Sequence, residues 1–159
     1  MAFRRIQWLF PIAVSLHNLE EALAYPHFLA VHASGLRWTI ETSAFWFAVS
    51  VLTLAAWIVT YFSWRDGAQS FSAYLVFGYA VVMLVNVAVP HVPLAVWFRG
   101  YTPGLITAVT VNLPCIAFLL ARALGERYVS RKKATKVSAV VMLGISTSIM
   151  LFFSAFARR

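Results

Sequence analysis

The segment WLFPIAVSLHNLEEALAY, residues 8–25, is mostly apolar, yet His17, Glu20 and Glu21 lie near its centre. On insertion scales a charged side chain in the middle of a membrane helix costs roughly 2.5–3.5 kcal/mol, so two adjacent carboxylates need partners or a function. Residues three and four apart share one face of a helix, and these three side chains should therefore point the same way. The segment predicts a transmembrane helix that carries a polar site.

The composition extends this prediction to the whole chain of 159 residues. It is 62 % hydrophobic and only 11 % charged, with a mean hydropathy of +0.79, which lies outside the usage of soluble domains. We therefore predict a single all-α domain over residues 1–159, a polytopic transmembrane helix bundle. A spanning helix needs about 20 mainly apolar residues. Five segments qualify, with Pro26 ending the first of them: 7–25, 40–62, 71–90, 104–124 and 137–156.

The basic residues indicate an orientation, because cytoplasmic loops are enriched in Lys and Arg. With the N-terminus inside, nine basic residues face the cytoplasm and four face outward, which favours an N-in, C-out arrangement in a bacterial cytoplasmic (inner) membrane. The terminal pair Arg158 and Arg159 opposes a fifth crossing. The start of the chain shows no convincing cleavable leader, and we interpret the first apolar segment as a retained helix.

The net charge of +8 is concentrated beside the predicted spans, with six basic residues between Arg122 and Lys136. Such a run favours contact with anionic membrane lipids. Aromatic and basic residues do not alternate as they do in nucleic-acid-binding proteins, so we expect no nucleic-acid partner. The single cysteine, Cys115, excludes an intrachain disulfide.

Further polar residues should gather in the outer half of the bundle, because alternating helices bring them to one side. The third span delivers Asn86 and His91, and the fourth begins near Tyr101. Asn86 and His91 lie about 140° apart around a regular helix, so they share a face only if Pro90 interrupts it. We interpret Asn86 as a hydrogen-bonding partner, and Tyr101 as either a site hydroxyl or a residue of the interfacial aromatic belt.

Three blocks of this sequence resemble the HXXEE-motif integral membrane proteins, a family without a settled activity. The blocks are Trp8-Leu-Phe-Pro11 with His17-Asn-Leu-Glu20-Glu21, then Asn86 with His91, then Tyr101-Thr-Pro-Gly-Leu-Ile-Thr107 with Asn112-Leu-Pro114. Together they cover about residues 8–114 and leave the fifth span outside. The resemblance implies the helix layout and the site residues, and it adds little about chemistry.

Three functions suit these residues. The first is a metal-dependent membrane enzyme, with zinc or iron held by His17, Glu20, Glu21 and His91, acting on a lipid or another apolar small molecule. Its catalytic set would also include Asn86 and Tyr101, and a second glutamate could serve as base. One motif supplies too few ligands for a di-iron centre in a monomer, so the site is mononuclear or completed in a homo-oligomer.

The second function is a metal-free acid/base isomerase that uses the same side chains, with His17 and one glutamate moving the proton. The third is non-enzymatic: an accessory or binding subunit of a larger membrane complex, or a transporter. A haem bound through His17 or His91 is a further alternative. The sequence does not separate these functions.

Overall fold

The computed structural model describes residues 2–32 and 39–158, and it confirms the predicted all-α architecture. Two π-helical segments join α4 to α5 and α6 to α7, so that residues 71–97 and 105–125 each form one continuous helical run. The helical elements are α1 (Phe3–Ile6), α2 (Leu9–His32), α3 (Thr42–Asp66), α4 (Phe71–Asn86), η2 (Val87–His91), α5 (Val92–Trp97), α6 (Leu105–Thr107), η3 (Ala108–Asn112), α7 (Leu113–Gly125) and α8 (Arg131–Phe156).

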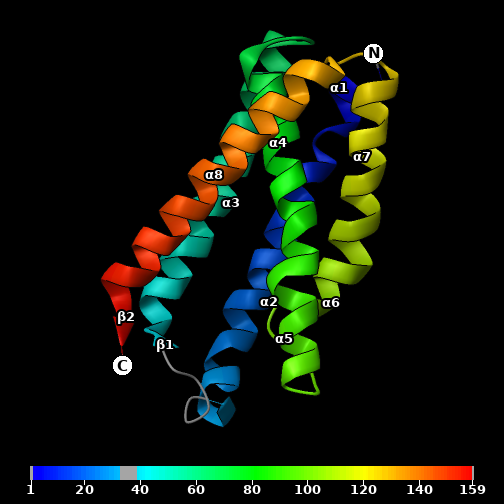
Figure 1. The fold of residues 1–159 in the computed structure, drawn as a ribbon. Coiled ribbons are helices and arrows are strands. Elements are labelled where there is room, and N and C mark those ends of the chain that lie inside the picture. Colours follow the sequence, from blue (N-terminus) through cyan, green and yellow to red (C-terminus); the bar gives the residue numbers. More distant parts are fainter. Residues whose placement is uncertain (1, 33–38, 159) are drawn as a thin grey trace.

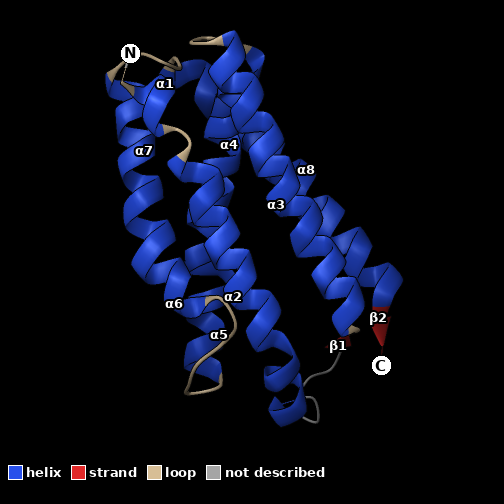
Figure 2. Ribbon diagram, turned by 180° about the vertical axis from the view of Figure 1, so that it is seen from behind, coloured by secondary structure: helices blue, strands red, loops and turns tan. Residues whose placement is uncertain are grey.

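The long helical runs alternate in direction and form an elongated bundle (Figures 1 and 2). The central helix α4 packs against α3, α7 and α8, and α2 packs against α3 and α7. Two short strands, β1 (Thr39–Ile40) and β2 (Ala157–Arg158), pair antiparallel where α3 begins and α8 ends. The N- and C-termini consequently lie at opposite ends of the bundle.

The first predicted span was too short, because α2 continues through Pro26 to His32. A proline inside a helix removes one hydrogen-bond donor, and membrane helices tolerate this where neighbouring groups or local distortion satisfy the backbone. The additional turns of α2 extend beyond the polar residues of the bundle, so that α2 and α5 end at the same end of the bundle (Figure 2).

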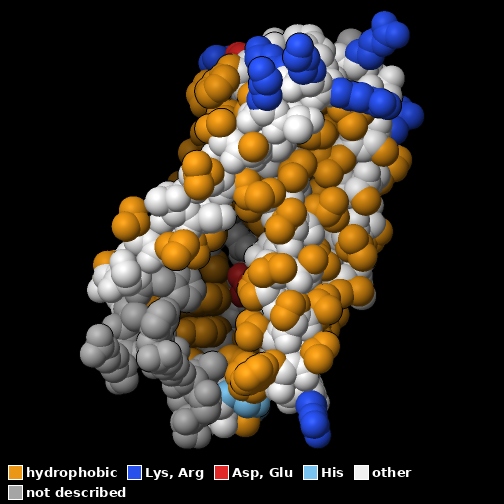
Figure 3. Space-filling view, in the orientation of Figure 1, with side chains coloured by type: hydrophobic (Ala, Val, Ile, Leu, Met, Phe, Trp, Pro, Cys, Tyr) orange, Lys and Arg blue, Asp and Glu red, His pale blue; other side chains and the backbone are white. Residues whose placement is uncertain are grey.

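Within the described residues, four helical runs are long and apolar enough to cross a membrane: residues 42–66, 71–97, 105–125 and 131–156. The helix α2 has 24 residues but is not among the four, since its central polar side chains lower its hydropathy. Apolar side chains cover the middle of the visible face, and Lys and Arg gather at the end where α8 begins (Figure 3). Two statements stay predictions: α2 crosses the membrane as a fifth span, and the basic end of the bundle faces the cytoplasm.

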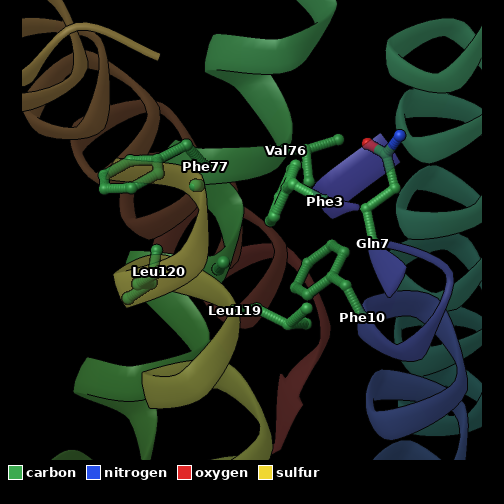
Figure 4. Close-up of a pocket in the computed structure, with 9 residues that line it drawn as sticks. Phe3, Gln7, Phe10, Val76, Phe77, Leu119 and Leu120 are labelled. Carbon is green, nitrogen blue, oxygen red and sulfur yellow. The ribbon is translucent and has the colours of Figure 1, made fainter. Parts of the chain in front are cut away.

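An apolar part of the core lies toward the basic end, between α1, α2, α4 and α7. Figure 4 shows Phe3, Phe10 and Val76 converging there with Leu119. The cavity between them has a volume of about 10 Å³, room for at most about one water molecule. This part of the core is therefore closely packed, and its cavity is too small for a substrate.

The contact between α4 and α8 depends on Gly78. A β-carbon at this position would lie 3.0 Å from Cγ2 of Val141 and 3.3 Å from Cα of Ser138. Membrane helices commonly approach one another closely at such small residues. Gly78 thus lets α8 lie directly against the central helix.

Candidate metal centre

Three of the four predicted metal ligands come together between α2 and η2. His17 and Glu21 lie one turn apart on α2, with 3.6 Å between His17 Nε2 and Glu21 Oε1. His91 reaches the same carboxylate oxygen from η2, with its Nε2 atom 3.3 Å away. The two imidazole rings meet edge to face, with their centroids 4.8 Å apart. One ligand atom from each residue lies within 4.8 Å of the others, as in a metal site.

The cluster is enclosed by the bundle. His17 is fully buried, His91 is 3 % exposed, and the side chain of Glu21 is 18 % exposed. Two imidazoles and a carboxylate thus face one another where little water can solvate them. Such a concentration of electron-rich atoms is expensive unless a cation or a shared proton lies between them.

The distortion at η2 turns Asn86 and His91 toward the same point. Val89 has an extended backbone inside this π-helical segment, with φ −145° and ψ 113°, so the regular helical register is lost before His91. The Asn86 side-chain amide nitrogen lies 3.0 Å from His91 Nε2 and 3.3 Å from His17 Nε2. An amide nitrogen only donates, so the lone pairs of both Nε2 atoms accept hydrogen bonds from Asn86.

Thr107 holds the other side of the His17 ring. Its Oγ1 atom lies 3.1 Å from His17 Nδ1, and its hydroxyl donates to the carbonyl of Gly104 at 3.4 Å. With Nε2 accepting from Asn86, Nδ1 carries the proton and donates to Thr107. Sequence reasoning placed Thr107 in a family block but not in the site. A hydroxyl among apolar residues at the start of a helix was the only signal for it.

Glu20, which was predicted as a fourth ligand, is not part of this group of three ligand atoms. Its carboxylate accepts hydrogen bonds from the backbone N–H groups of Ile106, at 3.2 Å, and Thr107, at 2.7 Å. The hydroxyl of Tyr101 donates to it at 2.7 Å. Glu20 therefore lies at the N-terminal end of the helical run 105–125, where the helix dipole favours a negative charge.

Tyr101 accordingly donates its hydroxyl to Glu20, which lies outside the group formed by His17, Glu21 and His91. Partial burial, together with the hydrogen bond to Glu20 and its charge, raises the pKa of the Tyr101 phenol. The hydroxyl therefore remains protonated and acts as a donor to the carboxylate.

Gly104 covers the cluster from the loop before α6. It adopts a left-handed conformation with φ +81°, which glycine tolerates best. A β-carbon there would lie 2.6 Å from Cγ of Glu21 and 2.8 Å from Cε1 of His91. The lack of a side chain therefore allows the loop backbone to close one side of the site.

Three other polar residues, His27, His32 and Asn112, lie outside the cluster. His32 stacks on Phe28 with ring centroids 4.6 Å apart, and it meets Phe98 edge to face, so it belongs to an aromatic group. His27 is exposed on α2. Asn112 is fully buried, and neither polar atom of its amide has a hydrogen-bond partner in the part of the chain that the structure describes.

Comparison with known proteins identifies relatives but no activity. The profile of a family described as "protein of unknown function with HXXEE motif" matches residues 8–119. The chain is 24 % identical over 139 residues to the uncharacterized protein YrkK of Bacillus subtilis (strain 168), covering 86 % of this chain and 87 % of that protein. No solved structure matches. The matched region contains every residue of the cluster and excludes α8.

Proposed function

This chain belongs to the family of proteins of unknown function with an HXXEE motif, and we propose that it is a metal-dependent membrane enzyme. The proposed metal is zinc or iron, and its ligands are His17, Glu21 and His91. The single observation that carries the proposal is the convergence of these three side chains on one buried point. A set of two histidines and one carboxylate is typical of catalytic zinc sites and of mononuclear iron sites with open positions.

The hydrogen bonds within the cluster favour a cation. Both Nε2 atoms accept from the Asn86 amide, so neither can also donate a proton to Glu21, which lies 3.3 Å from one and 3.6 Å from the other. The Glu21 oxygen therefore lies beside two acceptor nitrogens, and neither imidazole supplies a donor or a positive charge to a carboxylate at this position. A metal ion bound by all three side chains would take the two Nε2 lone pairs in place of the Asn86 amide and would supply a compensating positive charge.

The spacing of the ligand atoms also suits a metal. Nitrogen and oxygen ligands at about 2.0–2.2 Å from a tetrahedral ion lie roughly 3.4 Å from one another. The nitrogen–oxygen distances of 3.3 and 3.6 Å bracket this value. The three ligand atoms together lie within 4.8 Å of one another, so binding would draw the more distant pair closer.

The protein's own residues would orient the ligands. Thr107 holds His17 through Nδ1, and Asn86 lies beside both imidazoles. A bound zinc ion would supply Lewis-acid chemistry, and a bound iron would supply redox chemistry. Glu20 is a poor general base, since its oxygens already accept three hydrogen bonds. The arrangement therefore gives no support to a hydrolytic mechanism that uses Glu20 as base.

An apolar substrate, such as a lipid, suits the surroundings of the site. The helices around it expose apolar side chains, among them Leu16, Leu19 and Leu23 of α2. In Figure 3 an acidic side chain is visible at the base of a hollow in the apolar face. We propose that the substrate reaches the site laterally from a bacterial cytoplasmic membrane.

Elemental analysis of the detergent-purified protein tests the proposal. The protein would be loaded with Zn²⁺ or, without oxygen, with Fe²⁺, and compared with Glu21→Gln and His91→Ala. The matched control is His27→Ala, which removes an exposed histidine from the same helix as His17. We expect about one metal ion per chain in the wild type and the control, and at least a tenfold loss in the other two variants.

A folded wild type that binds neither ion would overturn the metal proposal. The same three bases could then share a proton, as the metal-free isomerase requires. Equal metal content in all variants would show that the ion binds elsewhere on the chain.

A further inference from the structure

We infer that Glu20 is a positioning residue, which fixes Thr107 and through it the orientation and tautomer of the His17 imidazole. The inference rests on the proposed function where it concerns metal affinity. Its geometric part, the connection from Glu20 to His17, concerns the metal-free protein as well.

The first link joins α2 to the helical run 105–125. The Glu20 carboxylate accepts from the backbone N–H groups of Ile106 and Thr107, and the latter contact is the shorter at 2.7 Å. These groups belong to the first turn of the run, where backbone donors have no intrahelical partner. Tyr101 adds a third donor from the preceding loop. The carboxylate thereby fixes the position of Thr107 relative to α2.

The second link joins Thr107 to His17. The Thr107 Oγ1 atom lies 3.1 Å from His17 Nδ1. A hydrogen bond to one ring nitrogen of a histidine decides which nitrogen keeps its lone pair and where that lone pair points. Together with the Asn86 donor, this contact leaves the proton on Nδ1 and the lone pair on His17 Nε2, beside Glu21.

The helix explains why the two glutamates differ. Adjacent residues are about 100° apart around an α-helix, so both can lie near His17 but face different neighbours. Glu21 faces η2 and His91, whereas Glu20 faces the run 105–125. The two carboxylates of the motif thus have separate tasks: one in the cluster, one supporting it.

The test compares Glu20→Gln, Glu21→Gln, Thr107→Val and Thr107→Ser. A glutamine at position 20 replaces one accepting carboxylate oxygen by an amide NH₂ group, which only donates and cannot accept from the backbone N–H groups of Ile106 or Thr107. Loss of such an outer contact commonly weakens metal affinity about 10- to 100-fold. We expect that loss in Glu20→Gln and Thr107→Val with one site still filled at saturating Zn²⁺, and near-wild-type affinity in Thr107→Ser.

The second readout is the ¹⁵N NMR shift of the His17 ring in the metal-free protein. We expect the Nδ1–H tautomer in the wild type and in Thr107→Ser, and a mixture of tautomers in Glu20→Gln and Thr107→Val. The matched control is Glu126→Gln, which alters another carboxylate that accepts a backbone N–H group, that of Phe3. The control should change neither readout.

Two results would overturn the inference. Glu20→Gln could leave affinity and tautomer unchanged, which would show that Glu20 does not act on His17. Alternatively, it could abolish the site as completely as Glu21→Gln with the tautomer unchanged, which would make Glu20 a ligand. If the wild type binds no metal, the proposed function fails. The tautomer comparison in the metal-free protein then still decides whether Glu20 acts on His17 through Thr107. If Glu20→Gln does not fold, the comparison of Thr107→Val with Thr107→Ser decides whether Thr107 acts on His17.

Discussion

The backbone of Gly104 lies against the imidazole of His17, so that a β-carbon at position 104 would fall 2.9 Å from His17 Cε1. The same β-carbon would also collide with Glu21 and His91. The backbone of Gly104, which lies outside the HXXEE motif, is therefore close to all three residues of the cluster.

Gly104→Ala should both destabilise the protein and disturb the cluster. A left-handed conformation costs a non-glycine residue about 1–2 kcal/mol, and the collision with three side chains adds to this. Thermal unfolding in detergent and metal content after loading with Zn²⁺ measure the two effects. The control is Gly144→Ala in α8, where a β-carbon meets no atom within 4 Å. A Gly104→Ala protein with normal stability and metal content would contradict the geometry.

Asn18, which lies inside the motif, should contribute to stability without contributing to metal binding. Its amide donates to the carbonyl of Val49 at 3.1 Å and to the hydroxyl of Thr53 at 2.7 Å, linking α2 to α3. Interhelical hydrogen bonds in membranes contribute about 0.6 kcal/mol on average. Asn18→Leu should lower the free energy of unfolding by about 0.5–1.5 kcal/mol and leave Zn²⁺ affinity unchanged. A weakened affinity would instead place Asn18 in the site's support.

Gly78→Val should separate α8 from α4. The added side chain has no space, since even a β-carbon would touch Val141 and the backbone of Ser138. We expect faster proteolysis within residues 131–156 and a lower unfolding temperature, with the metal site unaffected because α8 contributes none of its residues. Gly144→Val, on the open side of α8, is the matched control. Equal proteolysis of both variants would argue against the contact.

The interaction between Glu126 and the start of the chain should depend on pH. The backbone N–H of Phe3 donates to Glu126 at 3.0 Å and the Arg122 guanidinium lies 2.6 Å away, and these contacts hold the pKa of Glu126 below its ordinary value. A lowered pKa in the folded state contributes stability above the unfolded pKa of about 4.3, and this contribution is lost as pH falls through the folded pKa.

Unfolding temperatures of the wild type and of Glu126→Gln, measured between pH 7 and pH 3, would check this. The wild type should be the more stable at neutral pH, and the difference should shrink as the carboxyl group is protonated. A difference that stays constant over the range would show that the charge of Glu126 is not responsible.

The orientation can be measured with single cysteines in a Cys115→Ser background. A membrane-impermeant maleimide applied to intact cells should label Gly100→Cys, in the loop between α5 and α6. It should label Lys132→Cys, at the basic end, only after the cells are opened, since the positive-inside rule assigns that end to the cytoplasm. The reverse pattern would invert the orientation, and labelling of both from outside would contradict a membrane-spanning bundle.

The positions of most helices follow from the amino-acid sequence alone. The predicted spans 71–90 and 104–124 begin at or within one residue of the observed runs 71–97 and 105–125. Apolar length and the positions of proline and glycine carry that information, because each helix must satisfy its own backbone. Pro26 misled this reasoning, because a single proline does not end a helix whose neighbours tolerate the distortion.

The different positions of Glu20 and Glu21 follow from packing between helices and not from the sequence. His17, Glu20 and Glu21 share one face of α2 by sequence spacing alone, and that spacing cannot distinguish a glutamate in the cluster from one that supports it. The choice depends on which helix lies opposite each carboxylate: η2 for Glu21 and the run 105–125 for Glu20. The interrupted helix at Val89 likewise decides that Asn86 and His91 meet. Local periodicity places side chains on a helix, whereas packing between helices decides what they face.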